Sequence, residues 1–334
     1  MSVDENLAGI SNVLLYGAMT AYVVAMIAFA LDLADGQRTA KGEAARRARL
    51  EREAAKAGGA VATLPPPAAL ARGRRRAAAV ATSVLGVAFL LHLGSVVTRG
   101  FSVDRVPWGN MFEFAVTGCL VVTGVFLAAL VHARRNGFAG GRDLRYLGTF
   151  VVGPVLLTLG LALRAWYVEA AELVPALDSY WLIIHVAVAF LASALFTIGF
   201  STTVLQLVQD SRETRQREGR RTGVSFMAAL PSAQELERTS ARLHAVAFVL
   251  WTFTIIAGAI WAQKAWSRYW GWDAKEVWSF VIWVAYAAYL HARATRGWDG
   301  RRAAYLSMVG FTCLVANFTI VNIYFVGLHS YAGV

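Results

Sequence analysis

The chain has 334 residues, of which 57% are hydrophobic and 16% are charged, and its formal net charge is +11. Soluble domains are about half apolar and a quarter charged, so this composition excludes an ordinary soluble protein and indicates a polytopic membrane protein. The basic residues gather in alternate loops, which argues against a nucleic-acid-binding surface and predicts no nucleic-acid partner.

Eight continuously apolar stretches approach the roughly 20 residues that a transmembrane helix needs. They are residues 11–31, 77–98, 111–131, 147–166, 179–207, 243–263, 276–294 and 304–325. The runs do not alternate between apolar and polar residues, which favours helices over a β-barrel. The sequence therefore predicts an all-α membrane protein with about eight transmembrane helices.

The distribution of basic residues predicts the orientation of these helices. Of 32 Lys and Arg, 26 fall in segments 32–76, 132–146, 208–242 and 292–303. The other 6, on the opposite side, are Arg99, Arg105, Arg164, Lys264, Arg268 and Lys275. The positive-inside rule then predicts that both termini are outside the cytoplasm. Arg outnumbers Lys 28 to 4, which is typical of GC-rich bacteria, and the expected location is a bacterial plasma membrane.

Three regions follow along the chain. Residues 1–35 are expected to be an anchoring helix with a short outer N-terminus, since residues 1–10 carry acidic and no basic side chains. Residues 36–76 are expected to be a basic cytoplasmic linker, helical before Pro65-Pro66-Pro67 and flexible after them. Residues 77–331 are expected to form one membrane domain. Cys119 and Cys313 lie in apolar helices, and no CxxC motif occurs.

One outer loop, here called the Trp loop (residues 261–278), is unusually aromatic. It reads WAQKAWSRYWGWDAKEVW and holds five of the chain's eleven tryptophans, Trp261, Trp266, Trp270, Trp272 and Trp278. A membrane-interface belt explains one or two tryptophans at a helix end. Five together favour a platform for a planar ligand such as haem.

Two histidines are expected at the same outer level as the Trp loop. His185 lies about 8 Å inside the predicted fifth helix, at 1.5 Å per residue, and His329 directly follows the eighth. Bis-histidine haem ligation needs imidazoles on opposite faces of the iron. The pair therefore predicts an outer haem site. Asp273 and Glu276 are expected to support it by folding the loop, capping the next helix or bonding indole N–H groups.

A third histidine, His291, lies in the seventh predicted helix, about 22 Å from its outer end. An ionisable residue at that depth is a functional candidate. His92 is a poor partner for it, because the two would differ by about 14 Å in depth. His132 and His244 stand at inner helix ends among Arg-rich turns and are interpreted as interfacial residues.

The Trp loop resembles the tryptophan-rich WWD signature of haem-handling proteins, and the variant here is most similar to the CcsA/ResC family of system II cytochrome c biogenesis. Further matches are Ser179-Tyr180-Trp181 before His185, the run Leu290–Arg293 with Gly297-Trp298, the ending Gly327–Tyr331, and Arg99, Pro107, Asn110 and Glu113. The resemblance spans about residues 77–331. Ser267 and Ala274 depart from it, since they stand where Gly and Pro are expected.

The resemblance implies a function for these residues. Haem b, bound non-covalently as a transported substrate, enters from the cytoplasmic side, with His291 as one axial ligand and the other ligand supplied by a ResB-type membrane subunit. It then reaches the Trp loop, with His185 and His329 as ligands, and meets apocytochrome c, whose CxxCH cysteines a thiol-reducing pathway keeps reduced. Two thioether bonds form, so the chain would belong to a holocytochrome c synthase complex.

Two other functions fit the same features. A di-haem, b-type electron-transfer subunit would usually carry pairs of histidines on one helix, and no predicted helix here carries two. A haem exporter without synthase activity would present a similar outer site. Covalent haem on a co-expressed CxxCH protein distinguishes the exporter from the synthase.

Overall fold

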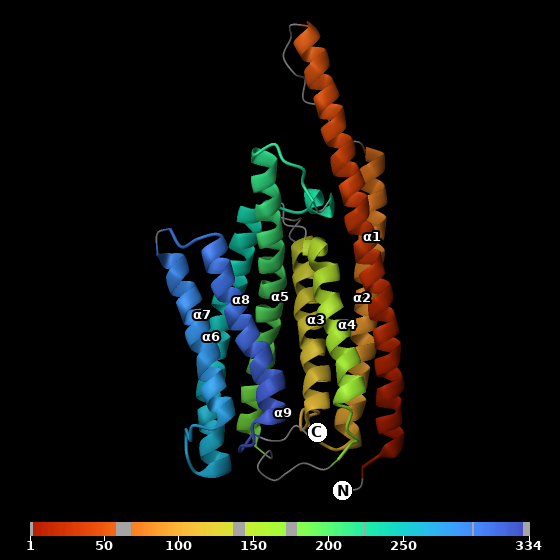
Figure 1. Cartoon of the computed structure of the whole chain (residues 1–334). Helices are drawn as coiled ribbons and strands as arrows, with labels where there is room; N and C mark the ends of the chain where they lie inside the picture. Colours follow the sequence, from red (N-terminus) through yellow and green to blue (C-terminus); the bar gives the residue numbers. More distant parts are fainter. Residues whose placement is uncertain are drawn as a thin grey trace.

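A computed structural model describes residues 3–57, 68–135, 144–171, 179–223, 225–295 and 297–329 of the chain. Throughout this described part the regular structure is helical (Figure 1), which confirms the predicted all-α class. The helices are α1 (Glu5–Ala57), α2 (Ala68–Ser102), α3 (Met111–Arg135), α4 (Gly148–Ala165), α5 (Tyr180–Arg217), α6 (Ala233–Trp266), α7 (Ala274–Ala294), α8 (Arg301–Ala316) and α9 (Asn322–Tyr324). Short 3-10 turns cover Leu144–Leu147 and Ser225–Ala229, and a π-helical turn, Asn317–Val321, joins α8 to α9.

Seven helical segments in the described part are long and apolar enough to cross a membrane, so the chain is a multi-pass membrane protein. They lie in α1 to α6 and in the stretch from α8 through α9. The remaining long helix, α7, has 21 residues that include two tryptophans and two tyrosines. It runs alongside α6 and α8 between the same two ends of the bundle (Figure 1). That α7 makes an eighth crossing of the membrane remains a prediction. The course of α7 beside α6 and α8 supports it.

The connections gather at two ends of the bundle. The N-terminus, the α2–α3 loop, the Trp loop and the segment after α9 lie at one end, while the extension of α1 and the α5–α6 connection lie at the other (Figure 1). A hydrogen bond from Asp4 N to Ser102 O, at 2.9 Å, ties the start of the chain to the end of α2. These connections therefore lie on the two sides that the distribution of basic residues predicts.

Helices α2 and α6 begin earlier in the chain than the sequence predicts. Helix α1 continues to Ala57, so residues 36–57 are helical as expected. Residues 58–67, which include the three prolines, lie outside the described part, but α2 begins at Ala68. The prediction of a flexible segment after the prolines is therefore wrong for residues 68–76. Helix α6 begins at Ala233, because Ser232 and Glu235 form a capping box that starts it ten residues before the predicted span.

The structure overturns the interpretation of His244 as an interfacial residue. Its side chain is fully buried, its Nδ1 lies 3.2 Å from Ser240 Oγ, and its ring packs beside Tyr286. Glycine on the neighbouring helix allows this approach, because a Cβ at Gly199 would lie 2.6 Å from His244 Nε2. Depth along a helix could not reveal that this residue faces the interior. His132, in the last turn of α3, is exposed as expected.

A buried ionic cluster shapes the α2–α3 loop. Glu113 accepts hydrogen bonds from Arg99 Nε at 3.0 Å, Arg105 Nη1 at 2.7 Å and Gly109 N at 2.9 Å. The three charged side chains are each at most 9% exposed. Arg99 also donates to Val168 O at 2.8 Å, which ties the loop to the segment after α4. The cluster therefore fixes the loop that forms one wall of the cavity described next.

Candidate functional site

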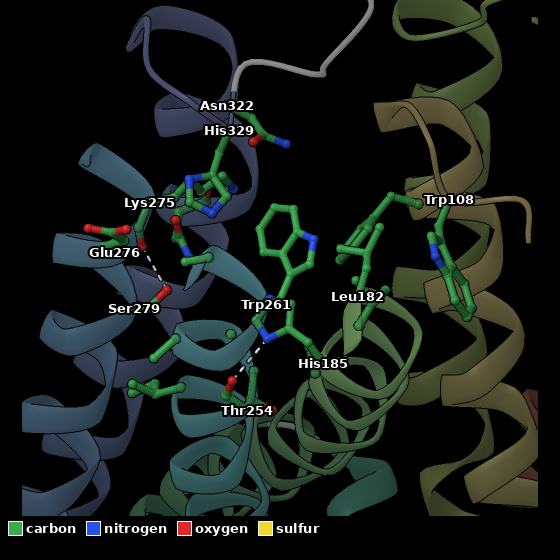
Figure 2. A pocket seen from close by; sticks show the side chains of 18 of the residues that line it. Trp108, Leu182, His185, Thr254, Trp261, Lys275, Glu276, Ser279, Asn322 and His329 are labelled. Carbon is green, nitrogen blue, oxygen red and sulfur yellow. Dashed lines mark hydrogen bonds between the residues drawn. The ribbon is translucent and has the colours of Figure 1, made fainter. Parts of the chain in front are cut away.

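A cavity of about 210 Å³ lies at the end of the bundle that carries the Trp loop. Residues of α5, α6 and α7 line it, together with the α2–α3 loop and the π-helical turn. Figure 2 shows His185, Trp261 and His329 following one another across this space, with Lys275 on one side and Trp108 on the other. The two histidines predicted to act together are thus brought to one cavity.

His185 projects from the first turns of α5 and is oriented by α6. Its Nδ1 lies 2.9 Å from the carbonyl oxygen of Thr254. A carbonyl only accepts, so Nδ1 carries the proton and the lone pair of the neutral ring is on Nε2. The ring fits because α6 has a glycine opposite: a Cβ at Gly258 would lie 2.7 Å from His185 Cε1. The result is an imidazole held rigidly in the tautomer that can bind a metal through Nε2.

His329 reaches the same cavity from the segment after α9. Its Nδ1 lies 2.7 Å from Asp273 Oδ2, and the other carboxylate oxygen accepts from Leu328 N at 2.9 Å. The hydrogen bond from His329, helped by that backbone bond, lowers the pKa of Asp273 to about 2, so Asp273 is ionised at physiological pH. Nδ1 therefore donates to a carboxylate, an arrangement common behind metal-binding histidines, and Nε2 is the ring nitrogen left to face a metal.

The contact between Asp273 and the segment after α9 requires glycine at position 327. A Cβ there would overlap Asp273 Oδ1. Ser330 and Tyr331, the last residues of the motif that begins with Gly327, lie outside the described residues.

Trp261 lies between the two imidazoles (Figure 2). Its indole is nearly parallel to the His185 ring, with centroids 6.1 Å apart and an interplanar angle of 11°. It meets the His329 ring at 64° and 5.6 Å. The indole thus fills space that separates the two imidazole rings. The cavity left beside it is smaller than the roughly 300–1,000 Å³ of usual ligand pockets.

The five predicted tryptophans occupy different places. Trp261 and Trp270 line the cavity, and Trp266 packs edge-on against His329 at 4.9 Å. Trp272 is 76% exposed and forms a T-shaped pair with Trp270. Trp278 is half-buried on α7 and is not among the residues that line the cavity. The loop therefore divides into a buried part beside the histidines and an exposed aromatic tip.

Glu276 folds the Trp loop, as expected for one of its acidic residues. Its Oε2 accepts hydrogen bonds from Gly271 N at 2.7 Å and Asp273 N at 3.0 Å. Asp273 is the N-cap of α7, and the two form a capping box. The predicted capping role is thus present. In addition, Asp273 orients His329, a link that sequence reasoning did not find, because 56 residues separate the two.

Ser267 and Ala274, the two residues that depart from the family pattern, lie at positions where the backbone explains the usual residue. Ser267 has φ 57°, in the left-handed region where glycine is favoured. Ala274 is the first residue of α7, where proline is favoured. Neither change disturbs the histidines. Trp272 also has a positive φ, 59°, which is unusual for a bulky residue and marks local strain in the exposed tip.

Sequence reasoning missed several other residues of the cavity. Trp108, in the α2–α3 loop, and Trp251, in the middle of α6, contribute further aromatic walls. Lys275 and Asn317 bring polar groups into the lining. The unusual composition of loop 99–110 was a signal for Trp108, whereas nothing in the spacing of α8 pointed to Asn317.

His291 lies away from this cavity, in the last turn of α7. Its side chain is exposed on the outside of the bundle. His92 is fully buried on α2, where its Nδ1 lies 3.1 Å from the hydroxyl of Tyr22. The two helices stand on opposite sides of the bundle (Figure 1), so His92 is no partner for His291.

Residues 87–329 match the model of a protein family described as Cytochrome C assembly protein. Several curated relatives are named cytochrome c biogenesis protein CcsA. The chain is 33% identical over 301 residues to the relative from Gloeobacter violaceus, covering 75% of this chain and 85% of that protein. It is 32% identical over 271 residues to one from Synechococcus sp. (strain CC9902), covering 74% and 85%.

A solved structure, that of the cytochrome c heme lyase CcmF, has a similar fold. The TM-score is 0.59 with 15% sequence identity, and the match covers 95% of this chain. It covers 47% of the CcmF chain, so the present chain spans about half the length of that protein. At this identity the likeness concerns the arrangement of helices alone.

Proposed function

Because the chain belongs to the cytochrome c assembly protein family and so acts in cytochrome c biogenesis, we propose that it holds haem between His185 and His329 and presents it to apocytochrome c for covalent attachment. Haem is the substrate here, bound without a covalent link to this chain. The site would lie on the extracytoplasmic face of a bacterial plasma membrane, as the distribution of basic residues favours.

The observation that supports this proposal most strongly is that both histidines are held through Nδ1. Each Nδ1 faces an acceptor, the Thr254 carbonyl or the Asp273 carboxylate. In each ring Nε2 is therefore the nitrogen left to bind haem iron, which takes the neutral imidazole as its ligand. The surrounding wall is largely apolar and aromatic, which suits a flat macrocycle.

Binding of haem requires space that Trp261 now fills. We propose that this indole withdraws from between the imidazoles and then packs against the ring. The left-handed residues Ser267 and Trp272 stand on either side of the loop's tip, where the backbone is strained and can change its conformation. Trp270, which lines the cavity, and the exposed Trp272 would then cover the ligand and exclude water.

The chemistry proposed for this site is an addition. Each cysteine thiol of a CxxCH motif adds across one vinyl group of haem, so that sulfur bonds to the vinyl carbon next to the ring and the proton ends on the terminal carbon. The addition itself needs no external oxidant or reductant. The role of this chain is to fix the iron with His185 and His329 and to keep the reacting edge in a water-poor aromatic setting.

Covalent haem on a reporter protein tests the proposed function. The chain is expressed with a ResB-type subunit and a soluble CxxCH reporter in a host without its own assembly system. We expect haem that stays on the reporter through denaturing electrophoresis, and none on a matched reporter with both cysteines changed to serine. Haem released outside the cell without covalent attachment would contradict the synthase function and favour an exporter.

The exposed position of His291 supports a role at a subunit contact. An imidazole on the outside of a membrane helix is costly in lipid unless a partner meets it. We propose that a ResB-type subunit covers this face and supplies the second ligand of an inner haem.

We expect His291→Ala to lower the haem-to-protein ratio of the purified two-subunit complex by about half, because one of two haem sites is lost. The ratio is measured from absorption spectra at a known protein concentration. His132→Ala, at an exposed position in the last turn of α3, serves as the control and should keep the wild-type ratio. An unchanged ratio in His291→Ala would leave His291 without a part in haem binding.

A further inference from the structure

Lys275 places its ε-amino group in the wall of the haem-site cavity. Its Nζ donates one hydrogen bond, to the carbonyl oxygen of Asn317 at 2.7 Å. An ammonium has three N–H donors, and among the described residues no second acceptor contacts it. Lys275, Asn322 and His329 lie on the same side of the cavity (Figure 2). The unused donors are thus available on the side of the pocket formed by α7 and the π-helical turn.

The acceptor for Lys275 comes from an irregular part of α8. The helix changes to a π-helical turn at Asn317–Val321, and such turns are often found at functional sites. The Asn317 side chain is 7% exposed, and its Oδ1 has no hydrogen-bond partner in the described structure. The unpaired Asn317 Oδ1 and the Lys275 amino group both belong to the lining of one cavity, which indicates a site prepared for polar groups of a ligand.

The neighbouring carboxylates form their hydrogen bonds with groups other than Lys275 Nζ. Glu276 Oε2 accepts two backbone N–H groups at the start of α7, while its Oε1 is buried without a hydrogen-bond partner in the described structure. Asp273 accepts from His329, Leu328 N and Lys275 N. Neither makes an ion pair with Lys275 Nζ in the described structure. Burial lowers the pKa of Lys275 to about 7, because a cation in a largely apolar wall is costly unless it is paired. An anionic group of a ligand would supply that pairing and stabilise the charged form.

We propose that Lys275 binds a carboxylate of the macrocycle held by His185 and His329, and so fixes the rotation of the ring in its own plane. This inference rests on the proposed function. Two axial histidines fix the iron but leave the ring free to turn about the axis that joins them. Haem carries two carboxylates on one edge and its vinyl groups elsewhere on the ring. An anchor for the carboxylate edge therefore determines where the vinyl groups stand relative to an incoming CxxCH peptide.

A structural role for Lys275 predicts a different result from a carboxylate-binding role. If Nζ served only to hold the π-helical turn through Asn317, its loss would lower the affinity for every ligand by the same factor. If it binds a carboxylate, its loss removes only the preference for ligands that carry one. The two roles are separated by comparing haem with its dimethyl ester, which keeps the iron and the ring but has no carboxylate.

The experiment measures the affinity of the purified chain for haem and for haem dimethyl ester by absorption titration. For the wild type we expect a preference for haem of roughly 10-fold or more, as a charged hydrogen bond of about 1.5–3 kcal/mol implies. Lys275→Met should bring the ratio close to one, and Lys275→Arg should keep most of it. Lys264→Met, an exposed change in the last turn of α6, should retain the wild-type ratio.

Three results would overturn the inference. The first is equal affinity of the wild type for haem and its ester. This measurement needs no variant, and such a result would not contradict the proposed haem site. The second is a wild-type ratio in Lys275→Met, with both ligands weakened alike, which would assign Lys275 a structural role. The third is failure of the wild type to bind either compound, which would remove the proposed function as well.

Discussion

Replacing either His185 or His329 with glycine is expected to abolish cytochrome c assembly while the protein stays folded in the membrane. Each substitution opens one axial position on the iron, and the aromatic wall still holds the ring. The six-coordinate, low-spin absorption spectrum that two imidazoles give should be lost, and the yield of holocytochrome should fall at least 100-fold. That loss corresponds to about 2.7 kcal/mol, a modest value for one metal ligand.

Imidazole in the medium provides the sharpest control for this prediction. The glycine variants leave a space the size of the missing side chain, so free imidazole should fill the vacancy and restore part of the spectrum and the yield. His132→Gly, at an exposed site on α3, should resemble the wild type with or without imidazole. If His185→Gly or His329→Gly kept a six-coordinate spectrum and full yield without imidazole, the pairing of these two histidines would be wrong.

Glu113→Gln is expected to cause the largest loss of stability of any single change to the ion pairs in the described part of the chain. It removes the charge that two buried guanidinium groups, those of Arg99 and Arg105, share. Breaking a buried ion pair by removing one partner costs about 3–5 kcal/mol. The free energy of unfolding in detergent micelles, followed during titration with a denaturing detergent, measures the effect.

An exposed ion pair supplies the matched control. Glu53 pairs with Arg49 on the outside of α1, where both side chains are more than half exposed. Glu53→Gln should change the free energy of unfolding by no more than about 0.5 kcal/mol. Equal effects of the two substitutions would show that the buried cluster does not hold the α2–α3 loop and the cavity wall in place.

The sequence predicted the helices well, because a membrane allows few ways to arrange an apolar segment. All eight expected spans lie on helices, but the lengths differ where helices continue into water. Helix α6 is an example. Its first turns are polar, and hydropathy therefore missed them, although the Ser232–Glu235 capping box marked the start of the helix.

Only those parts of the candidate site that residue types and their positions along the helices reveal could be predicted from the sequence. A cluster of tryptophans is visible in the sequence, and His185 and His329 could be assigned to its level from their distance to helix ends. The acceptors that fix their tautomers could not be found in this way. Thr254 acts through its backbone carbonyl, which any residue has. Asp273 meets His329 only because two distant segments converge. Likewise the burial of His244 depends on which face of α6 meets α5.

The two proposed axial ligands differ in how firmly they are anchored. His185 belongs to the 38-residue helix α5, whereas His329 stands on an irregular segment after α9 and is held mainly by Asp273. Irregular segments move on nanosecond to microsecond timescales, far faster than packed helices shift. On the proposed function, the two iron–nitrogen bonds would therefore break in a fixed order. His329 would leave first, freeing one face of the iron for the histidine of the CxxCH motif, while His185 retains the haem until the cytochrome has taken it.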